Sequence, residues 1–177
     1  MRLVRFTILA AIVVSGLVSA NASLLNGTSV SVTYLFPDTN TAFAATQSAT
    51  VGSGTEFFNY AGLVDVDVSD TNVLMTFTRD GGPNAVAFDG LKFVFTPTLS
   101  SVSINPASTF VAFGTSALTL SGDTLYVNFA NLFVPNGSTL SLDLTGVVSS
   151  TPEPSSLLLL GSGVLGLAGV FRRKFRM

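Results

Sequence analysis

The residues best able to do chemistry in this chain are carboxylates. Asp65 and Asp67 stand two positions apart in a segment of alternating residues, which would place both on one face of a strand, about 7 Å apart at the backbone. Two carboxylates held in this way could act as the acid and base of a glycosidase. The interpretation that we favour is a solvated strand face that keeps the protein soluble.

Asp70 follows this pair closely and suggests a second kind of chemistry. Calcium, a hard cation, binds clustered carboxylate and carbonyl oxygens, so Asp65, Asp67 and Asp70 are candidate calcium ligands. The chain has no EF-hand loop and no glycine-aspartate repeat to support such a site. We therefore predict no metal site. The alternative is a calcium site formed by these three residues.

The composition excludes several classes of enzyme. The chain of 177 residues has no histidine and no cysteine. A Ser-His-Asp triad, a Cys-His pair and the common zinc sites are therefore excluded, and no disulfide can stabilise the fold. We expect no catalytic residues and no cofactor, and we predict that the protein is not an enzyme.

The middle of the chain shows the period-two alternation of half-buried strands. In the segment 63–69, for example, valines alternate with Asp65, Asp67 and Ser69. Turn sequences such as Asp80-Gly81-Gly82-Pro83 separate such segments. The predicted fold is all-β, an antiparallel β-sandwich of jelly-roll or immunoglobulin-like type. Strands are predicted at 28–36, 63–69, 72–79, 86–96, 101–105, 117–120, 124–131 and 138–148, and 41–51 could be a loop or an edge strand.

Phenylalanines supply most of the predicted aromatic core. Alternation predicts that most of the following set face inward: Phe57, Phe58, Phe93, Phe95, Phe110, Phe113, Phe129 and Phe133. There is no tryptophan, and there are only three tyrosines, so the sequence does not support the exposed aromatic platform that is usual in carbohydrate-binding modules.

The N-terminus has the pattern of a secretory signal peptide. Arg2 and Arg5 flank the start of an apolar stretch, 6–18, and Ala20-Asn21-Ala22 forms an A-x-A cleavage site. We predict a signal peptide at 1–22 that is cut after Ala22, with Ala20 as the alternative. Such a peptide implies the Sec translocon and signal peptidase as partners.

The C-terminus has three unlike parts in a fixed order. Pro152-Glu153-Pro154 is followed by an uncharged apolar stretch, 157–171, and then by the basic residues Arg172, Arg173, Lys174 and Arg176. With the two preceding serines the stretch reaches roughly 25 Å as a helix, the short end of a bilayer span. We predict a transmembrane helix at 157–171 with its basic end in the cytoplasm; the alternative is a buried helix of a soluble core.

These three parts together resemble the PEP-CTERM sorting signal of Gram-negative bacteria, a tail that is also known as an ice-binding protein C-terminal domain. The resemblance covers residues 151–177. It implies recognition by an exosortase, a membrane protease that cuts near the Pro-Glu-Pro motif and passes the protein onward. The predicted domains are then a signal peptide (1–22), a β-sandwich ectodomain (23–150) and the sorting signal (151–177).

Charge is distributed very unevenly between the signals and the ectodomain. The whole chain has a net charge of −2, but six of its eight basic residues lie in the two signals. Only Arg79 and Lys92 remain in 23–150, against nine acidic residues, which gives this part a net charge of −7. A domain so acidic should repel nucleic acid, and we exclude that class of partner.

Together these patterns predict an exported protein that is held transiently in the inner membrane and then released to the cell surface or the extracellular matrix. We expect a structural or adhesive role with a link to exopolysaccharide. The alternatives are a carboxylate-dependent glycosidase and a calcium-dependent carbohydrate-binding module.

Overall fold

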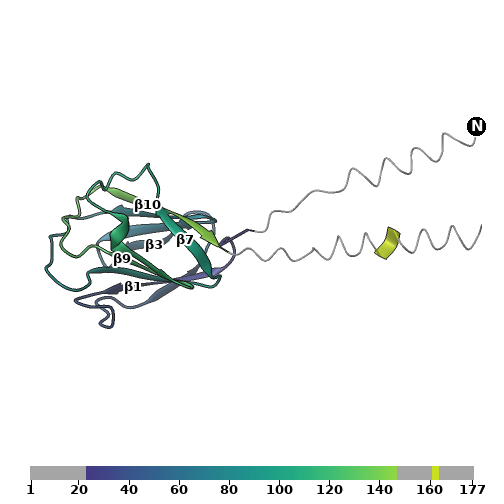
Figure 1. Ribbon diagram of the computed structural model, residues 1–177, viewed down its shortest axis with the longest axis horizontal. Helices are drawn as coiled ribbons and strands as arrows, with labels where there is room; N and C mark the ends of the chain where they lie inside the picture. Colours follow the sequence, from purple (N-terminus) through teal and green to yellow (C-terminus); the bar gives the residue numbers. More distant parts are fainter. Residues whose placement is uncertain (1–22, 147–160, 164–177) are drawn as a thin grey trace, which may run out of the picture. The chain divides into compact units, whose positions relative to one another are not determined.

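The computed structural model describes residues 23–146 and 161–163, and in the first range it shows ten strands and one short 3₁₀ helix. The strands form two five-stranded antiparallel sheets, in the orders β2-β1-β6-β9-β8 and β3-β4-β5-β10-β7 (Figure 1). The prediction of an all-β, antiparallel fold is confirmed. The elements are β1 (Ser29–Leu35), β2 (Gln47–Thr50), β3 (Thr55–Tyr60), β4 (Val64–Ser69), β5 (Asn72–Phe77), β6 (Gly90–Phe95), β7 (Leu99–Ile104), η1 (Thr115–Ala117), β8 (Leu118–Ser121), β9 (Thr124–Asn128) and β10 (Thr139–Gly146).

Alternating side chains explain why these segments are strands. In β4 the three valines are buried, and the intervening Asp65 and Asp67 lie on the outer face of their sheet. In β10 Leu140, Leu142 and Leu144 are buried in the same way. Because successive side chains of a strand point to opposite faces, each sheet gains one apolar and one polar face.

The two apolar faces meet in one hydrophobic core. Its residues run from Leu24 to Leu144 and come from both sheets, so the domain has a core of its own. An aromatic cluster, formed by Phe77, Phe110, Phe113 and Phe129, fills one end. The ring centroids of its contacting pairs lie 5.3–6.3 Å apart, and Phe77 makes edge-on contacts with Phe110 and Phe129.

Two predicted core aromatics are on the surface instead. Phe58 is 79% exposed and Phe133 is 53% exposed, whereas the other six residues of that set are buried. Phe57 and Phe58 are neighbours in β3, so only one of them can face the core, and Phe57 does. Phe133 belongs to the loop that follows β9.

The predicted strands differ from the observed ones mainly in β3 and β6. β3 was not predicted, because Phe57-Phe58 breaks its alternation and its pairing with β4 contains register shifts. The strand predicted at 86–96 begins only at Gly90. The segment 41–51 contains the edge strand β2, which pairs only with β1.

Tight turns set the register of the hairpins. The β4–β5 hairpin pairs Ser69 with Asn72 across a two-residue turn. The β8–β9 hairpin pairs Ser121 with Thr124 in the same way, and Gly122 in that turn has a φ of +63°, which glycine adopts without steric cost.

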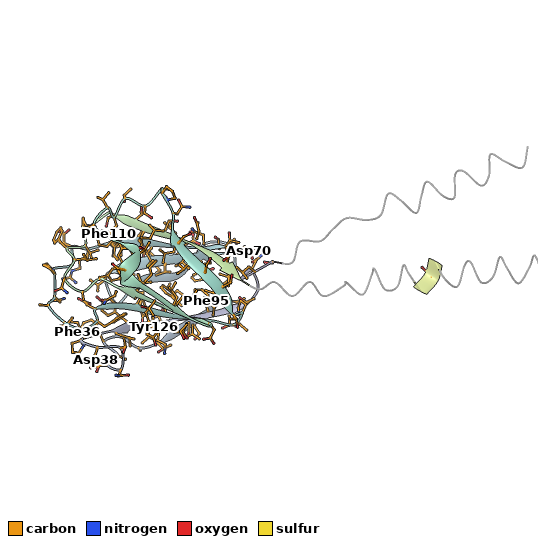
Figure 2. The ribbon with its side chains drawn as sticks, viewed as in Figure 1. Phe36, Asp38, Asp70, Phe95, Phe110 and Tyr126 are labelled. Carbon is orange, nitrogen blue, oxygen red and sulfur yellow. The ribbon has the colours of Figure 1, made fainter. Side chains whose placement is uncertain are left out.

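The two ends of the described domain lie close together. Leu24 approaches Gly146 so closely that a Cβ atom on the glycine would lie 2.3 Å from the leucine Cδ1. Asp70 and Phe95 lie at this end in Figure 2, whereas Phe36 and Asp38 lie at the opposite end. We call the end with Leu24 and Gly146 the entry end and the opposite one the far end.

The predicted signal peptide and most of the predicted membrane helix lie outside the described residues. Of the apolar stretch only residues 161–163 are described, and they are helical. Among residues 23–146 and 161–163, no helix has the length and apolar character needed to cross a bilayer. The domain boundaries and the membrane helix therefore stay predictions.

Gly90 marks a close approach between β6 and β9. A Cβ atom at this position would lie 2.0 Å from the carbonyl oxygen of Val127, a backbone atom that cannot move without breaking the sheet. We predict that Gly90→Ala lowers the free energy of unfolding by at least about 3 kcal/mol, the upper range for overpacking. Urea denaturation of the ectodomain measures the effect.

The matched control is Gly52→Ala, where the nearest atom to the new Cβ would be 3.9 Å away and where φ is not positive. This control should stay within about 0.5 kcal/mol of the wild type. Equal stability of the two variants would contradict the close approach at Gly90.

Candidate functional site

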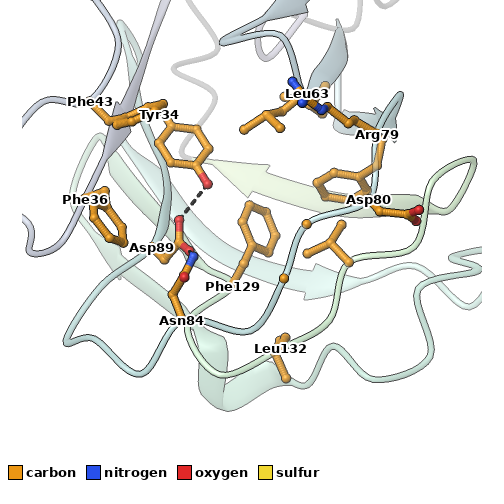
Figure 3. Close-up of a pocket in the computed structure, with 15 residues that line it drawn as sticks. Tyr34, Phe36, Phe43, Leu63, Arg79, Asp80, Asn84, Asp89, Phe129 and Leu132 are labelled. Atoms are coloured by element: carbon orange, nitrogen blue, oxygen red, sulfur yellow. Dashed lines mark hydrogen bonds between the residues drawn. The ribbon is translucent and has the colours of Figure 1, made fainter.

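A pocket of about 330 Å³ opens at the far end of the domain. The ends of β1 and β5 and the start of β4 line it, together with the loops 78–89 and 129–134 that connect the strands there (Figure 3). Its wall consists of Tyr34, Phe36, Phe43, Leu63, Val64, Phe77, Arg79, Asp80, Gly81, Gly82, Asn84, Asp89, Phe129, Leu132 and Val134.

The floor of the pocket is the end of the hydrophobic core. The rings of Phe77 and Phe129 meet edge to face with centroids 5.3 Å apart, and both are buried. Val64 and Val134 are buried beside them as further wall residues. Because these side chains belong to the core cluster, the floor is rigid and apolar.

Three aromatic rings form one side of the pocket. The centroid of Phe43 lies 5.5 Å from that of Tyr34 and 6.3 Å from that of Phe36. Phe43 lines the pocket and is nevertheless 63% exposed. An exposed ring at the mouth offers a flat apolar surface to a ligand.

Local hydrogen bonds hold the loop that presents Phe43. The Phe43 N–H donates to the Tyr34 carbonyl at 2.8 Å. The Asp38 carboxylate accepts from the N–H groups of Asn40 and Thr41, at 2.8 and 2.9 Å, and these bonds, that of Asn40 foremost, lower the pKa of Asp38. The loop is therefore fixed by its own residues near the pocket.

Asp89 is a buried carboxylate in the pocket wall, with only 5% of its surface exposed. Tyr34 donates its hydroxyl hydrogen to one carboxylate oxygen at 2.6 Å, and the Asn84 amide donates to the other at 2.6 Å (Figure 3). The Asp89 N–H donates to the Asn128 side chain at 3.1 Å. A buried carboxylate needs such donors, and here they come from β1 and the loop 78–89, whereas the backbone bond ties Asp89 to β9.

Burial raises the pKa of Tyr34 far above its usual value, and the hydrogen bond to Asp89 and the negative charge of that carboxylate raise it further. Tyr60, which ties the two sheets together, also has a raised pKa because of its burial. Its hydroxyl donates to the Ala45 carbonyl at 2.9 Å and accepts from the Tyr34 N–H at 3.0 Å. Neither hydroxyl is suited to act as a base at neutral pH.

The rim opposite the aromatic rings combines two charged residues with two glycines. Arg79 and Asp80 line it next to Gly81 and Gly82. The Asp80 carboxylate accepts from the Asn136 N–H at 2.8 Å. Gly81 and Val134 exchange two backbone hydrogen bonds of 2.9 Å, and a Cβ atom on Gly82 would meet nothing within 4 Å. The glycines thus leave the mouth open on this side.

The structure does not bring the three predicted carboxylates together in a site. Asp65 accepts from the Asn59 N–H at 2.6 Å on the outer face of β4. Burial and the nearby charge of Glu56 raise the pKa of Asp67. No group of three histidine, cysteine, aspartate or glutamate residues suited to a metal ion occurs in the described residues.

Asp70 holds the start of the domain in place. Its carboxylate accepts from the Ser23 hydroxyl and from the N–H groups of Leu25 and Asn26, the latter two at 2.9 and 3.1 Å. These bonds lower its pKa, the one from Ser23 most. The Asp70 carboxylate therefore fixes the first residues of the domain at the entry end.

The sorting and cleavage residues lie outside the described residues. They are Pro152, Glu153, Pro154, Arg172, Arg173, Lys174, Arg176, Ala20 and Ala22, and their roles stay predictions of the sequence.

The pocket residues Tyr34, Asn84 and Asp89 were not predicted as a site. Tyr34 and Asp89 are 55 positions apart and meet only in the folded sheet. Asn84 and Asp89 lie in or next to a loop of ordinary composition, so no local motif could have identified them.

Comparison with known families identifies the tail. The family model described as the PEP-CTERM protein-sorting motif matches residues 150–174. The predicted resemblance is confirmed, and the chain carries a sorting signal of this kind. The match covers none of the residues of the pocket. No curated protein and no solved structure is significantly similar to the chain.

The hydrogen bonds of Asp70 predict a loss of stability in Asp70→Ala. This change would leave the N–H of the fully buried Leu25 without its acceptor, at a cost of about 1–3 kcal/mol at pH 7. Because the folded-state pKa of Asp70 is lowered, its contribution is present above the unfolded value of about 3.9 and is lost as pH falls below it. The difference between wild type and variant should therefore shrink below pH 4.

Urea denaturation at pH 7 and pH 3 tests this, with Asp123→Ala as the control. Asp123 bonds only the hydroxyl of its neighbour Thr124 through its side chain. A deficit in Asp70→Ala that is equally large at pH 3 would contradict the role of the charged carboxylate.

The bond from Tyr34 to Asp89 predicts a second effect on stability. Tyr34→Phe removes one of the two side-chain donors to a buried carboxylate, which should cost about 1–3 kcal/mol at pH 7. The folded-state pKa of Tyr34 is raised. The contribution of its hydroxyl to folding stability is therefore intact below the pKa of tyrosine in the unfolded chain, about 10, and is lost as pH rises further. Wild-type stability should fall above pH 10, and less steeply in Tyr34→Phe.

The control at pH 7 is Tyr126→Phe, since the Tyr126 ring packs edge-on against Phe88 and does not line the pocket. It should change the free energy of unfolding by no more than about 0.5 kcal/mol. Equal losses in the two variants would show that the bond to Asp89 has no special importance.

Proposed function

We propose that this chain is a substrate of an exosortase that is released to the cell surface or extracellular matrix, where its β domain has a structural or adhesive role linked to exopolysaccharide. The observation that carries the proposal is the PEP-CTERM sorting motif at residues 150–174. The motif implies an exported protein that is targeted by an exosortase. The role of the domain is inferred from the position of its pocket and from its charge.

The start of the domain agrees with the predicted signal cleavage after Ala22. Leu24 and Leu25 belong to the hydrophobic core, and Ser23 donates its hydroxyl to Asp70. A cut after Ala22 would leave all three residues in the mature protein. A cut further along the chain would remove core residues, at a cost of about 2 kcal/mol or more for each buried leucine.

The geometry of the domain suits display on an anchor. Its first and last described residues lie at the entry end, and the pocket lies at the far end. An anchor that is attached after residue 146 would therefore leave the far end free. The net charge of −7 in 23–150 would keep the domain soluble and away from anionic surfaces.

The geometry supports a role in binding more than catalysis. The chain has neither histidine nor cysteine, and Asp65 and Asp67 lie on an outer sheet face and not in the pocket. The two carboxylates that do line the pocket, Asp80 and Asp89, accept hydrogen bonds from Asn136, Tyr34 and Asn84. Both are held in the wall as hydrogen-bond acceptors, an arrangement that suits the binding of a ligand.

Processing is tested by mass spectrometry of the exported protein in a strain that contains an exosortase. We expect surface or medium fractions to contain the β domain without peptides from Arg172–Met177. A variant in which Pro152, Glu153 and Pro154 are all replaced by alanine should keep its C-terminus and remain in the membrane fraction.

The matched control is the wild-type chain in a strain that lacks the exosortase, which should retain the same C-terminal peptides. Recovery of intact Arg172–Met177 from surface material of the exosortase-containing strain would refute the proposal.

A further inference from the structure

We propose that the pocket at the far end binds one neutral sugar residue, and that this site gives the domain its adhesive function. This inference deepens the proposed function and depends on it for its biological meaning. The binding itself depends only on the pocket, whose residues all belong to the described domain. Four features of the pocket support it.

The first feature is the aromatic side of the pocket. A pyranose ring has an apolar face of C–H groups, which packs well on an aromatic ring because the ring face is electron-rich. Phe43 offers such a face, with 63% of its surface exposed, and its ring contacts that of Tyr34 at a tilt and that of Phe36 edge-on. These adjacent rings thus provide an aromatic platform that the low tyrosine content and the lack of tryptophan had not suggested.

The second feature is the mixture of charges around the same cavity. Arg79 would oppose a cationic ligand, and Asp80 and Asp89 would oppose an anionic one. The charge of −7 in 23–150 further disfavours anions. A hydroxyl group can donate a hydrogen bond to a carboxylate and accept one from a guanidinium. A neutral polyhydroxy ligand can therefore bind the acidic and the basic side chains at the same time.

The third feature is the unused hydrogen-bonding capacity of the wall. The carboxylates of Asp80 and Asp89 each have about four acceptor sites, and in the structure Asp80 accepts one hydrogen bond and Asp89 accepts two. Asn84 uses one amide hydrogen for Asp89 and has a carbonyl oxygen and a second hydrogen to offer. Because Tyr34 and Asn84 already hold Asp89 in place, a ligand would meet a pre-organised acceptor.

The fourth feature is size and access. A volume of 330 Å³ lies at the lower end of the range for ligand pockets, roughly 300–1,000 Å³. It therefore suits a single ring and not a long oligosaccharide. At Gly82 the rim is open, since a Cβ atom there would meet nothing within 4 Å, so a sugar within or at the end of a longer chain could extend past this point.

Protein-observed NMR on the ¹⁵N-labelled ectodomain, 23–150, which has a core of its own, tests the site. The probes are the methyl glycosides of glucose, mannose and galactose, each titrated to 50 mM. We expect at least one of them to give saturable shifts with a Kd of about 1 mM, as is usual for a ligand of this size. The affected amides should be those of Tyr34, Gly81, Gly82 and Asn84.

Variants locate the binding on the aromatic platform. Phe43→Ala should weaken binding about two- to tenfold through loss of one ring contact. Because Phe43 is 63% exposed and outside the hydrophobic core, the variant should fold as the wild type does. Arg79→Gln should weaken binding as well, because a donor to the sugar is lost. The matched control is Phe58→Ala, an exposed phenylalanine on β3 outside the pocket, which should leave the Kd unchanged.

Three results would overturn the inference. The first is the absence of saturable shifts with all three glycosides. The second is equal binding by the wild type and Phe43→Ala. The third is tighter binding of choline, a cationic probe, or of acetate, an anionic probe, than of any glycoside. None of these results would affect the processing seen by mass spectrometry. Failure of the sugar site and failure of the exosortase route are therefore distinguished by separate measurements.

Discussion

The structure depends on one apolar layer that is enclosed by two sheets. The chain has no cysteine, so no covalent bond between strands supports the fold, and burial of that layer must supply most of the stability. Valines of β4 and leucines of β10, in one sheet, share this layer with phenylalanines of β6, in the other sheet. Close packing then restricts the backbone at particular points, of which Gly90 beside Val127 is the most severe.

The same layer explains why the domain has a pocket at its far end. Sheets enclose a core along their strands, but at the strand ends loops must cover it. Here Phe77 and Phe129 close the core, and the loops stand apart from them by enough to leave the cavity. The covering loops bring polar backbone and side-chain groups to this end of the core. One of these groups is the buried carboxylate of Asp89. Tyr34 and Asn84 donate hydrogen bonds to the Asp89 carboxylate and make its burial tolerable.

Much of the fold could be predicted because alternation is a local property. The segments of β1, β4 and β10 repeat apolar residues with period two and were located within a residue or two at each described end. β3 was missed because Phe57-Phe58 interrupts that period, and the exposure of Phe58 shows why the interruption is tolerated. The strand order could not be predicted, since it depends on which distant segments pair, as β10 does with β5 and β7. The pocket was beyond prediction for the same reason, because Tyr34 and Asp89 are distant in the chain.

The two kinds of functional information in this chain differ in how they are encoded. A sorting signal is recognised as a linear segment, so Pro152-Glu153-Pro154, the apolar stretch and the basic end could be identified without a structure, and the family match at 150–174 confirms this. A binding site is recognised as a surface, and its residues come from wherever the strands end. The proximity of Leu24 to Gly146 connects the two, because it requires the chain to enter and leave the domain at one end. The chain therefore continues from the domain at its entry end, at the opposite end from the pocket.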